Sequence, residues 1–305
     1  MFEIQSIHIA SAKLYGFGIY MALGFLSLLA YLLYRTKHKA GLYACITLPI
    51  SILTGRLIYC FFRRNTVFYS PMDGSFLGIQ EIFNFSIGGI SIYGCLAGVL
   101  LACFLIGKIE KKPFLNTVGL FSPGIASLMA FMHYANFLGG EGFGNIALEN
   151  ANPIFYVFND YGEAYLAVFR FEALFCLAFA IYLFFSKKSC SKKAIVFLSI
   201  YTAMFLFFAS LHRDSSLRLE SNGFIRVDQL ISYVILLCVL IYILRIRKKH
   251  KFTYVLSFIL CSVFVIAAEF FEKIPLPTWF LYSLSLISCI NLGVLFAKDT
   301  ESIVN

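Results

Sequence analysis

The chain consists of apolar stretches about twenty residues long that alternate with short polar segments. A hydrocarbon core about 30 Å thick needs about twenty apolar residues in a helix, and backbone groups in lipid must bond within their own segment. Such runs lie at 15–34, 42–62, 88–107, 114–134, 164–186, 194–211, 228–244, 252–269 and 278–297. The pattern predicts an all-α, polytopic transmembrane helical bundle of about nine spans.

The segments between these runs alternate in charge. Every second connection, together with the segment after the last run, is rich in Lys and Arg and holds 16 of the 25 basic residues. The other connections hold ten of the 16 acidic residues. Because basic connections stay in the cytoplasm, the N-terminus is predicted outside and the C-terminus in the cytoplasm. The sixteen basic residues are Arg35, Lys37, Lys39, Lys108, Lys111, Lys112, Lys187, Lys188, Lys192, Lys193, Arg245, Arg247, Lys248, Lys249, Lys251 and Lys298.

The composition agrees with a protein of the lipid bilayer. Hydrophobic residues make up 60% of the chain and charged residues only 13%, far below the share in soluble domains. The net charge of +9 comes from the basic connections, and it would attract anionic lipid headgroups. Nucleic-acid binding is therefore not needed to explain it, and none is expected. The nine cysteines show no CxxC or metal-ligand spacing, so no metal, disulfide or cofactor is predicted.

The first fifteen residues lack the features of a signal peptide, so the first apolar run is expected to stay as a span. The connections predicted to face outward are the long ones. Segments 63–87, 135–163 and 212–227 mix Gly, Asn, aromatic and charged residues, whereas the inward connections are short and basic. Functional residues are therefore expected at the outer face.

Charged residues inside the predicted spans cost free energy in lipid, so each is expected to have a structural or functional role. Arg56 either snorkels toward the outer headgroups or clamps a lipid phosphate with its planar guanidinium. The glycine-rich run 88–98 favours close helix packing over close approach of a headgroup. Tyr93, within it, fits a tyrosine of the interfacial belt.

Further polar residues gather near the ends of other spans. His133 and Asn136 are three residues apart and share a helix face, and Glu141 follows shortly after, so a structural and a catalytic histidine both stay open. Arg170 and Glu172 are two residues apart, so each is expected to find a separate partner. The 212–228 segment is either a solvated charged loop or the wall of a pocket for an anionic headgroup.

Several motifs point to a known family. They comprise Leu14-Tyr15-Gly16; Gly55-Arg56 with Tyr59; Gly88-Gly89-Ile90-Ser91-Ile92-Tyr93-Gly94; Asn136, Gly140, Glu141 and Gly144; Glu172-Ala173; Arg213; and Asp228-Gln229-Leu230-Ile231-Ser232. In these motifs, over most of residues 14–245, the chain resembles prolipoprotein diacylglyceryl transferases. These bacterial membrane enzymes move a diacylglyceryl group from phosphatidylglycerol to the lipobox cysteine of prelipoproteins.

The resemblance implies a seven-span transferase-like domain over residues 1–250, followed by two additional transmembrane helices over 251–305. It also implies the bacterial plasma (inner) membrane, phosphatidylglycerol or a related anionic phospholipid as donor, and a prelipoprotein lipobox peptide as acceptor. The reaction would form a thioether at a glycerol carbon, with glycerol phosphate leaving at the outer face.

The chain departs from the family pattern where the chemistry is expected. Tyr93 stands where the family has a catalytic histidine and His133 where it has an essential arginine, while Leu206 and Ser210 replace an arginine and a glutamate. We therefore predict His133 as the base and Tyr93 as its hydrogen-bonding partner. The substrate-binding residues that the resemblance implies are Arg56, Asn136, Glu141, Gly144 and Arg213.

Two other functions are compatible with the sequence. Loss of the expected polar positions fits a catalytically degenerate relative that binds lipid or lipoprotein without transfer. A small-molecule transporter would need a polar path to the inner face, and the inner halves of the predicted spans hold almost no ionisable residues.

Overall fold

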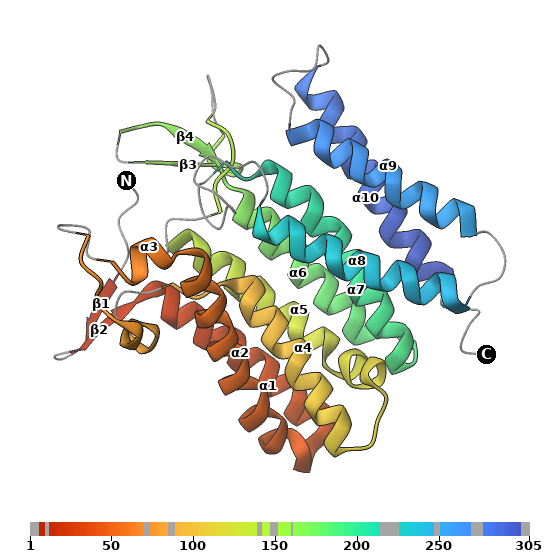
Figure 1. Cartoon of the computed structure of the whole chain (residues 1–305), viewed down its shortest axis with the longest axis horizontal. Coiled ribbons are helices and arrows are strands. Elements are labelled where there is room, and N and C mark those ends of the chain that lie inside the picture. Colours follow the sequence, from red (N-terminus) through yellow and green to blue (C-terminus); the bar gives the residue numbers. More distant parts are fainter. Residues whose placement is uncertain are drawn as a thin grey trace.

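The computed structural model describes residues 6–9, 12–69, 74–84, 89–138, 142–146, 152–159, 161–213, 226–246, 251–269 and 277–299. Its long helices are α1 (Gly16–Thr36), α2 (Ala40–Phe62), α4 (Ile92–Ile109), α5 (Phe114–Leu138), α6 (Val168–Phe185), α7 (Cys190–Leu211), α8 (Val227–Ile246), α9 (Lys251–Glu269) and α10 (Thr278–Asp299) (Figure 1). Each predicted apolar run overlaps one of them, so the prediction of a helical membrane bundle is confirmed.

The described residues hold eight helical stretches long and apolar enough to cross a membrane. The first of these, 16–62, joins α1 and α2 through the short 3-10 helix η1 (Lys37–Lys39). The number of spans and the orientation of the termini therefore stay predictions.

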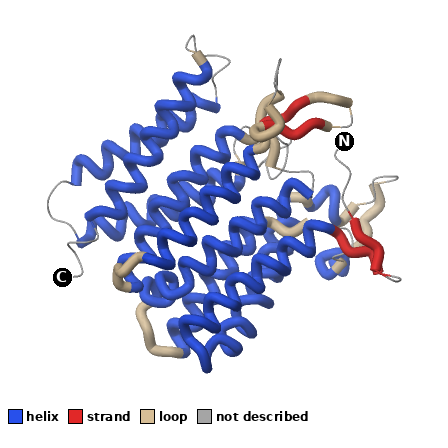
Figure 2. The backbone as a smooth tube through the Cα atoms, turned by 180° about the vertical axis from the view of Figure 1, so that it is seen from behind, coloured by secondary structure: helices blue, strands red, loops and turns tan. Residues whose placement is uncertain are grey.

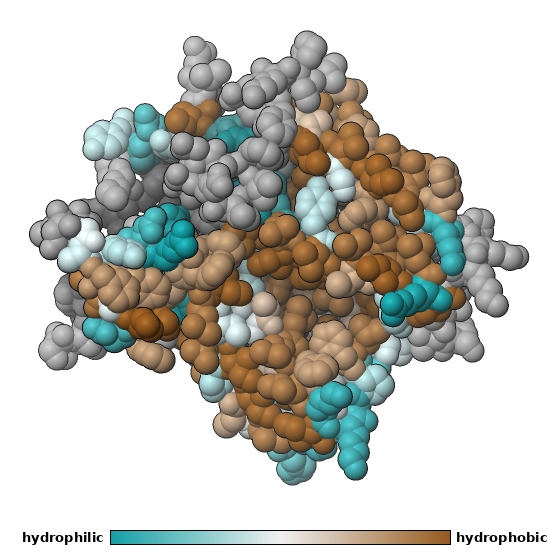
Figure 3. All heavy atoms as spheres, viewed as in Figure 1, coloured by the Kyte–Doolittle hydropathy of each residue, from teal (hydrophilic) through white to brown (hydrophobic). Residues whose placement is uncertain are grey.

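Helices α5 and α7 form the centre of the bundle. Helix α5 packs against α1, α4, α6 and α7, while α7 also packs against α8 and α10. Phe121, Ile125 and Leu128 of α5 and Phe197 and Phe205 of α7 are almost fully buried. The flanking helices instead expose large apolar side chains, and apolar residues dominate the visible flank of the bundle in Figure 3. An apolar belt of this kind suits lipid rather than water.

Small residues bring α2 and α4 into close contact. A Cβ added at Gly98 would lie 2.0 Å from Thr54 Oγ1 and 2.6 Å from Ser51 Cα, and one at Gly94 would lie 2.7 Å from Gly55 Cα. The glycines of the 88–98 run that the structure describes in α4 therefore serve helix packing, as the sequence favoured.

The short elements gather at one end of the bundle. These are β1 (Ser6–Ile9), β2 (Ala12–Tyr15), α3 (Arg64–Val67), η2 (Ile79–Phe83), β3 (Tyr156–Phe158) and β4 (Ala164–Leu166) (Figures 1 and 2). Strands β1 and β2 form one antiparallel hairpin, and β3 and β4 form another. The basic connections α1–α2, α4–α5 and α6–α7 lie at the opposite end (Figure 1).

Candidate functional site

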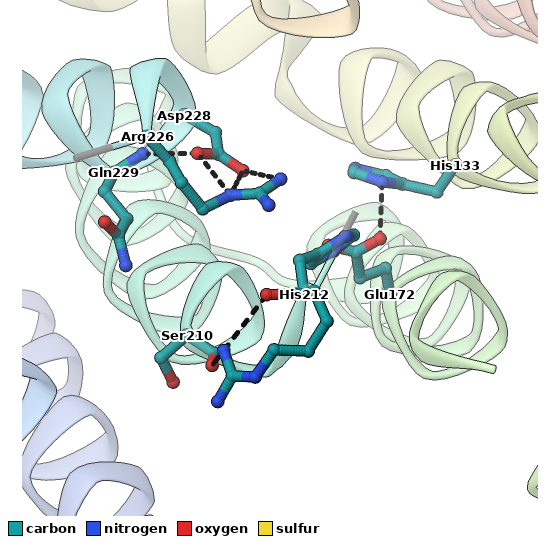
Figure 4. A network of polar contacts seen from close by, with 8 residues as sticks. His133, Glu172, Ser210, His212, Arg226, Asp228 and Gln229 are labelled. Atoms are coloured by element: carbon teal, nitrogen blue, oxygen red, sulfur yellow. Dashed lines mark hydrogen bonds and ion pairs between the residues drawn. The ribbon is translucent and has the colours of Figure 1, made fainter. Parts of the chain in front are cut away.

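A buried carboxylate lies between two histidines at the end of the bundle that carries the hairpins. Glu172, in the first turns of α6, faces His133 of α5 through Oε2, which is 3.0 Å from His133 Nδ1. Its other oxygen, Oε1, is 2.9 Å from Nε2 of His212, directly after α7. All three side chains are buried. Figure 4 shows them close to one another. Three helices thus converge on one carboxylate that has an imidazole on each side.

The imidazole of His133 is held by stacking as well as by charge. Its ring lies on Phe205 of α7, with centroids 4.6 Å apart. The contact with Glu172 has the distance of an ion pair but not the direction of a hydrogen bond, and Nε2 has no hydrogen-bond partner among the described residues. A buried imidazole with one nitrogen beside a carboxylate and the other available has the layout of a general base.

Tyr93 also contacts Phe205, the residue on which the His133 ring stacks. It is buried in the first turn of α4, and its ring meets Phe205 edge-on at 6.4 Å. The interpretation of Tyr93 as an interfacial belt tyrosine is therefore wrong, because the packing of α4 against the centre of the bundle removes its side chain from the lipid surface.

A second ionic pair lies close to the histidines, at the start of α8. Arg226 holds Asp228 with Nε and Nη2 at 3.2 Å from the carboxylate oxygens, and both residues are buried. Asp228 also accepts the backbone N–H of Gln229, at 2.9 Å, as an acidic residue in the first turn of a helix commonly does. Figure 4 shows the Arg226 guanidinium turned to the side where His133 and Glu172 lie.

Arg56 has a different set of contacts. Its guanidinium donates to the backbone carbonyls of Glu81, Ile82, Asn84 and Gly89 over 2.8–2.9 Å, and its side chain is fully buried. The snorkelling interpretation is therefore wrong: Arg56 holds the segment that leads into α4. Its predicted binding of a lipid phosphate stays a prediction.

Arg213 joins three parts of the chain. Its Nε donates to Asn145 Oδ1 at 2.8 Å, Nη1 donates to the carbonyls of Ser210 and His212, and Nη2 contacts the Tyr282 hydroxyl of α10. Its backbone N–H donates to the carbonyl of Phe143 at 2.9 Å. The guanidinium therefore caps the carboxyl end of α7, next to His212.

Gly144 lies where no side chain would fit. A Cβ there would be 2.9 Å from the Leu211 carbonyl, and its backbone N–H donates to Leu166 of β4 at 2.8 Å. Asn136 is half-buried one turn after His133. Glu141, like Gly140, lies outside the described residues.

Comparison with known proteins identifies the family of the chain. A family model described as prolipoprotein diacylglyceryl transferase matches residues 5–245. The chain belongs to the prolipoprotein diacylglyceryl transferase family. Helices α9 and α10 lie beyond the matched segment.

Several curated relatives carry the name phosphatidylglycerol–prolipoprotein diacylglyceryl transferase. One from Clostridium kluyveri is 25% identical over 249 residues, which cover 77% of this chain and 93% of the relative. One from Clostridium botulinum (strain Langeland) is 27% identical over 260 residues, covering 81% and 98%. One from Bacillus licheniformis is 29% identical over 251 residues, covering 77% and 89%.

Within this family member, the structure brings together some of the predicted residues. His133 and Tyr93 meet on Phe205, and Arg213 and Gly144 meet at the end of α7. Sequence reasoning assigned no individual role to Glu172, His212, Arg226 or Asp228, although it considered the 212–228 segment as the wall of a headgroup pocket. The signal that pointed to Glu172 was its spacing from Arg170, which predicted separate partners for the two residues. Arg170 donates to the carbonyls of Pro153 and Ile154, while Glu172 contacts the two histidines.

The chain also has two apolar grooves between its helices. One, of about 560 Å³, lies between α1, α5 and α6 and is lined by Tyr20, Tyr134, Phe155, Arg170 and Leu174 among others. Another, of about 340 Å³, lies between α1 and α2. Neither groove is lined by His133 or Glu172, so the polar centre and the apolar grooves are separate features.

Proposed function

We propose that this chain transfers a diacylglyceryl group from phosphatidylglycerol to the lipobox cysteine of a prelipoprotein, at the outer face of the bacterial inner membrane. Membership of the family and the names of its relatives support the reaction class. The observation that carries the proposal is the buried contact between His133 and Glu172. An imidazole held beside a carboxylate is suited to act as the base that the reaction needs.

The chemistry is a displacement at a glycerol carbon. The cysteine S–H loses its proton to the base, the sulfur forms a C–S bond with the glycerol carbon, and the C–O bond to the phosphate breaks. Glycerol phosphate leaves with the electron pair of that bond. A thiol is a poor nucleophile until it is deprotonated, so the base determines the rate at neutral pH.

In this proposal His133 Nε2 takes the thiol proton. Glu172, beside Nδ1, orients the ring and stabilises the imidazolium that forms. Tyr93 contacts Phe205, the same aromatic residue that His133 contacts. Its hydroxyl would donate a hydrogen bond to the reacting group. The chain would in this way replace the family's histidine at position 93 by one at position 133.

The remaining predicted residues are proposed to bind the substrates. Arg213 and Arg56 would supply positive charge for the phosphate, and Asn136, Glu141 and Gly144 would orient the headgroup. The ion-paired Arg226 adds a third guanidinium on the side of His133.

One observation favours a second candidate, a relative that binds lipid or lipoprotein without transfer. The guanidinium groups of Arg56 and Arg213 already donate to protein oxygens, so a phosphate would have to share or displace these bonds. The apolar grooves between α1, α5 and α6 and between α1 and α2 would hold acyl chains without any transfer.

The test is incubation of the purified protein with phosphatidylglycerol vesicles and a lipobox peptide, followed by mass spectrometry of the peptide. We expect a mass gain of one diacylglyceryl group with wild type, and its loss in both His133→Ala and the bulkier His133→Gln. His38→Ala is the matched control, because His38 is exposed at the basic end of the bundle. No gain with wild type, together with measurable lipid binding, would establish the second candidate instead.

A further inference from the structure

The two C-terminal helices are closely packed against the matched part of the chain. Helix α10 runs along α7, and a Cβ added at Gly293 would lie 3.2 Å from Ile200 Cα and 3.4 Å from Ala203 Cβ. Leu292 and Phe296, on the same face of α10, are fully buried. Helix α10 therefore covers the side of α7 that α5 does not, although no part of it falls within the family match.

At its N-terminal end, α10 meets the candidate site through one side chain. The hydroxyl of Tyr282, in the first turns of α10, contacts Nη2 of Arg213. The same guanidinium binds Asn145 and the carbonyls of Ser210 and His212. Its planar fork is thus fixed from three directions: the 142–146 segment, the end of α7, and α10.

This fixed guanidinium is linked to the proposed base through short steps. Arg213 follows His212, whose backbone carbonyl it binds, and His212 Nε2 contacts Glu172 at 2.9 Å. Glu172 in turn lies 3.0 Å from His133. A change in how Arg213 is held would therefore change the position of His212 and of the carboxylate that orients His133.

We propose that Tyr282 of α10 is a positioning residue of the transferase site. The proposal rests on the proposed function. The hydroxyl of Tyr282 touches no reacting atom; it holds Arg213, and through Arg213 the carboxyl end of α7. Side chains that orient a site in this way act through the groups they hold, and loss of one such contact lowers the rate without removing the site.

The kinetic test compares Tyr282→Phe with wild type in the peptide assay. We expect kcat, per folded protein, to fall about tenfold, the size expected for loss of one hydrogen bond to a charged group. KM for phosphatidylglycerol should rise as well, because the guanidinium that Tyr282 holds is the one proposed to bind the lipid phosphate. Ser283→Ala is the matched control: it removes a hydroxyl from the next residue of α10, where the side chain is exposed.

The double variant separates positioning from a purely structural role. If Tyr282 acts through Arg213, Tyr282→Phe should have little further effect once Arg213→Lys has removed the planar fork. Independent contributions to folding would instead multiply the two losses. A thermal midpoint for Tyr282→Phe close to that of wild type should accompany the loss of rate.

Hydrogen exchange tests the same contact without the reaction. The backbone N–H of Arg213, bonded to the Phe143 carbonyl, should exchange faster in Tyr282→Phe than in wild type or Ser283→Ala. If wild type transfers no lipid, the proposed function fails, and the exchange rates then decide whether Tyr282 holds this end of α7. Wild-type exchange in Tyr282→Phe overturns the proposal, as does wild-type kcat.

Discussion

Two buried charged residues of this chain, Arg56 and Glu172, have surroundings of different kinds. Arg56 is fully buried and donates to four backbone carbonyls, so its contacts hold a segment of chain in place. Glu172 is equally buried but faces two imidazoles, whose charge depends on protonation. Burial of a charge without partners costs several kcal/mol, so both need such surroundings. Only the second set contains imidazoles, the side chains that most often act as acids or bases in enzymes.

Glu172→Gln should lower the transfer rate about hundredfold, because the amide keeps the shape of the side chain but removes the charge that orients and stabilises the His133 imidazolium. Steady-state rates in the peptide assay measure the effect, and the amount of folded protein comes from size-exclusion chromatography in detergent. Glu163→Gln, in the exposed β3–β4 hairpin, is the matched control. Equal rates for Glu172→Gln and wild type would exclude the proposed role of this carboxylate.

At the scale of elements, close contact between helices depends on residues without side chains. Helices α2 and α4 meet where Gly55, Gly94 and Gly98 leave no room for a Cβ. Such close approach gains dispersion contacts along both backbones, which matter in lipid because the hydrophobic effect does not drive helices together there. The same contact positions the start of α4, where Tyr93 lies.

Gly98→Ala should destabilise the protein by about 1–3 kcal/mol, because its Cβ would overlap Thr54 Oγ1 and Ser51 Cα. Thermal unfolding in detergent measures this. Gly41→Ala in α2 is the control, since no atom lies within 4 Å of the added Cβ, and it should leave stability unchanged or raise it by up to about 1 kcal/mol. A Gly98→Ala protein as stable as wild type would mean that α2 and α4 are less close than described.

An ion pair ties two connections at the basic end. Lys39 Nζ lies 2.6 Å from Glu110 Oε2, and Lys112 approaches the same oxygen at 3.4 Å. The hydrogen bond from Lys39 lowers the pKa of Glu110 from its ordinary value of 4.5. A carboxyl with a lowered pKa in the folded state stabilises the protein above its unfolded pKa and loses that effect as the pH falls through the folded value.

The stability difference between wild type and Glu110→Gln should therefore be present at neutral pH and vanish as the pH falls below the ordinary carboxyl pKa. It should also shrink in high salt, because the pair is at the surface. Thermal midpoints across pH, at low and high salt, provide the measurement. A difference that grows on acidification would contradict the assigned sign.

At the scale of the whole molecule, the two opposite ends of the bundle carry different kinds of residue. The hairpins and the His133–Glu172–His212 cluster lie at one end, and the Lys- and Arg-rich connections lie at the other (Figure 1). Basic connections stay in the cytoplasm, so the site should open to the outside, where a prelipoprotein would arrive.

A fluorescent protein fused after residue 305 should fluoresce, and an alkaline phosphatase fused at the same place should be inactive. Both outcomes follow from a cytoplasmic C-terminus, since the first reporter matures inside the cell and the second only outside. Fusions within the connection between α9 and α10 should give the reverse result. Matching behaviour at the two positions would show that α10 does not cross the membrane.

Local sequence alone determined the helices and the class of the protein. Runs of about twenty apolar residues can satisfy their backbone in lipid only as helices, so the predicted ranges match the observed helices closely. The separation of Arg170 from Glu172 was also predictable, because residues two apart on a helix point to different sides. The motifs in residues 14–245 indicated the family in the same way.

Only the tertiary structure decided which side chains meet. His133 lies on α5, Glu172 on α6 and His212 directly after α7, up to 79 positions apart in sequence. No periodicity within one helix encodes the contact between them. The burial of Tyr93 and the link from Tyr282 to Arg213 likewise depend on how α4 and α10 pack. In lipid, apolar faces of many helices are equally able to pack, so hydrophobic pattern determines the spans and specific packing determines the site.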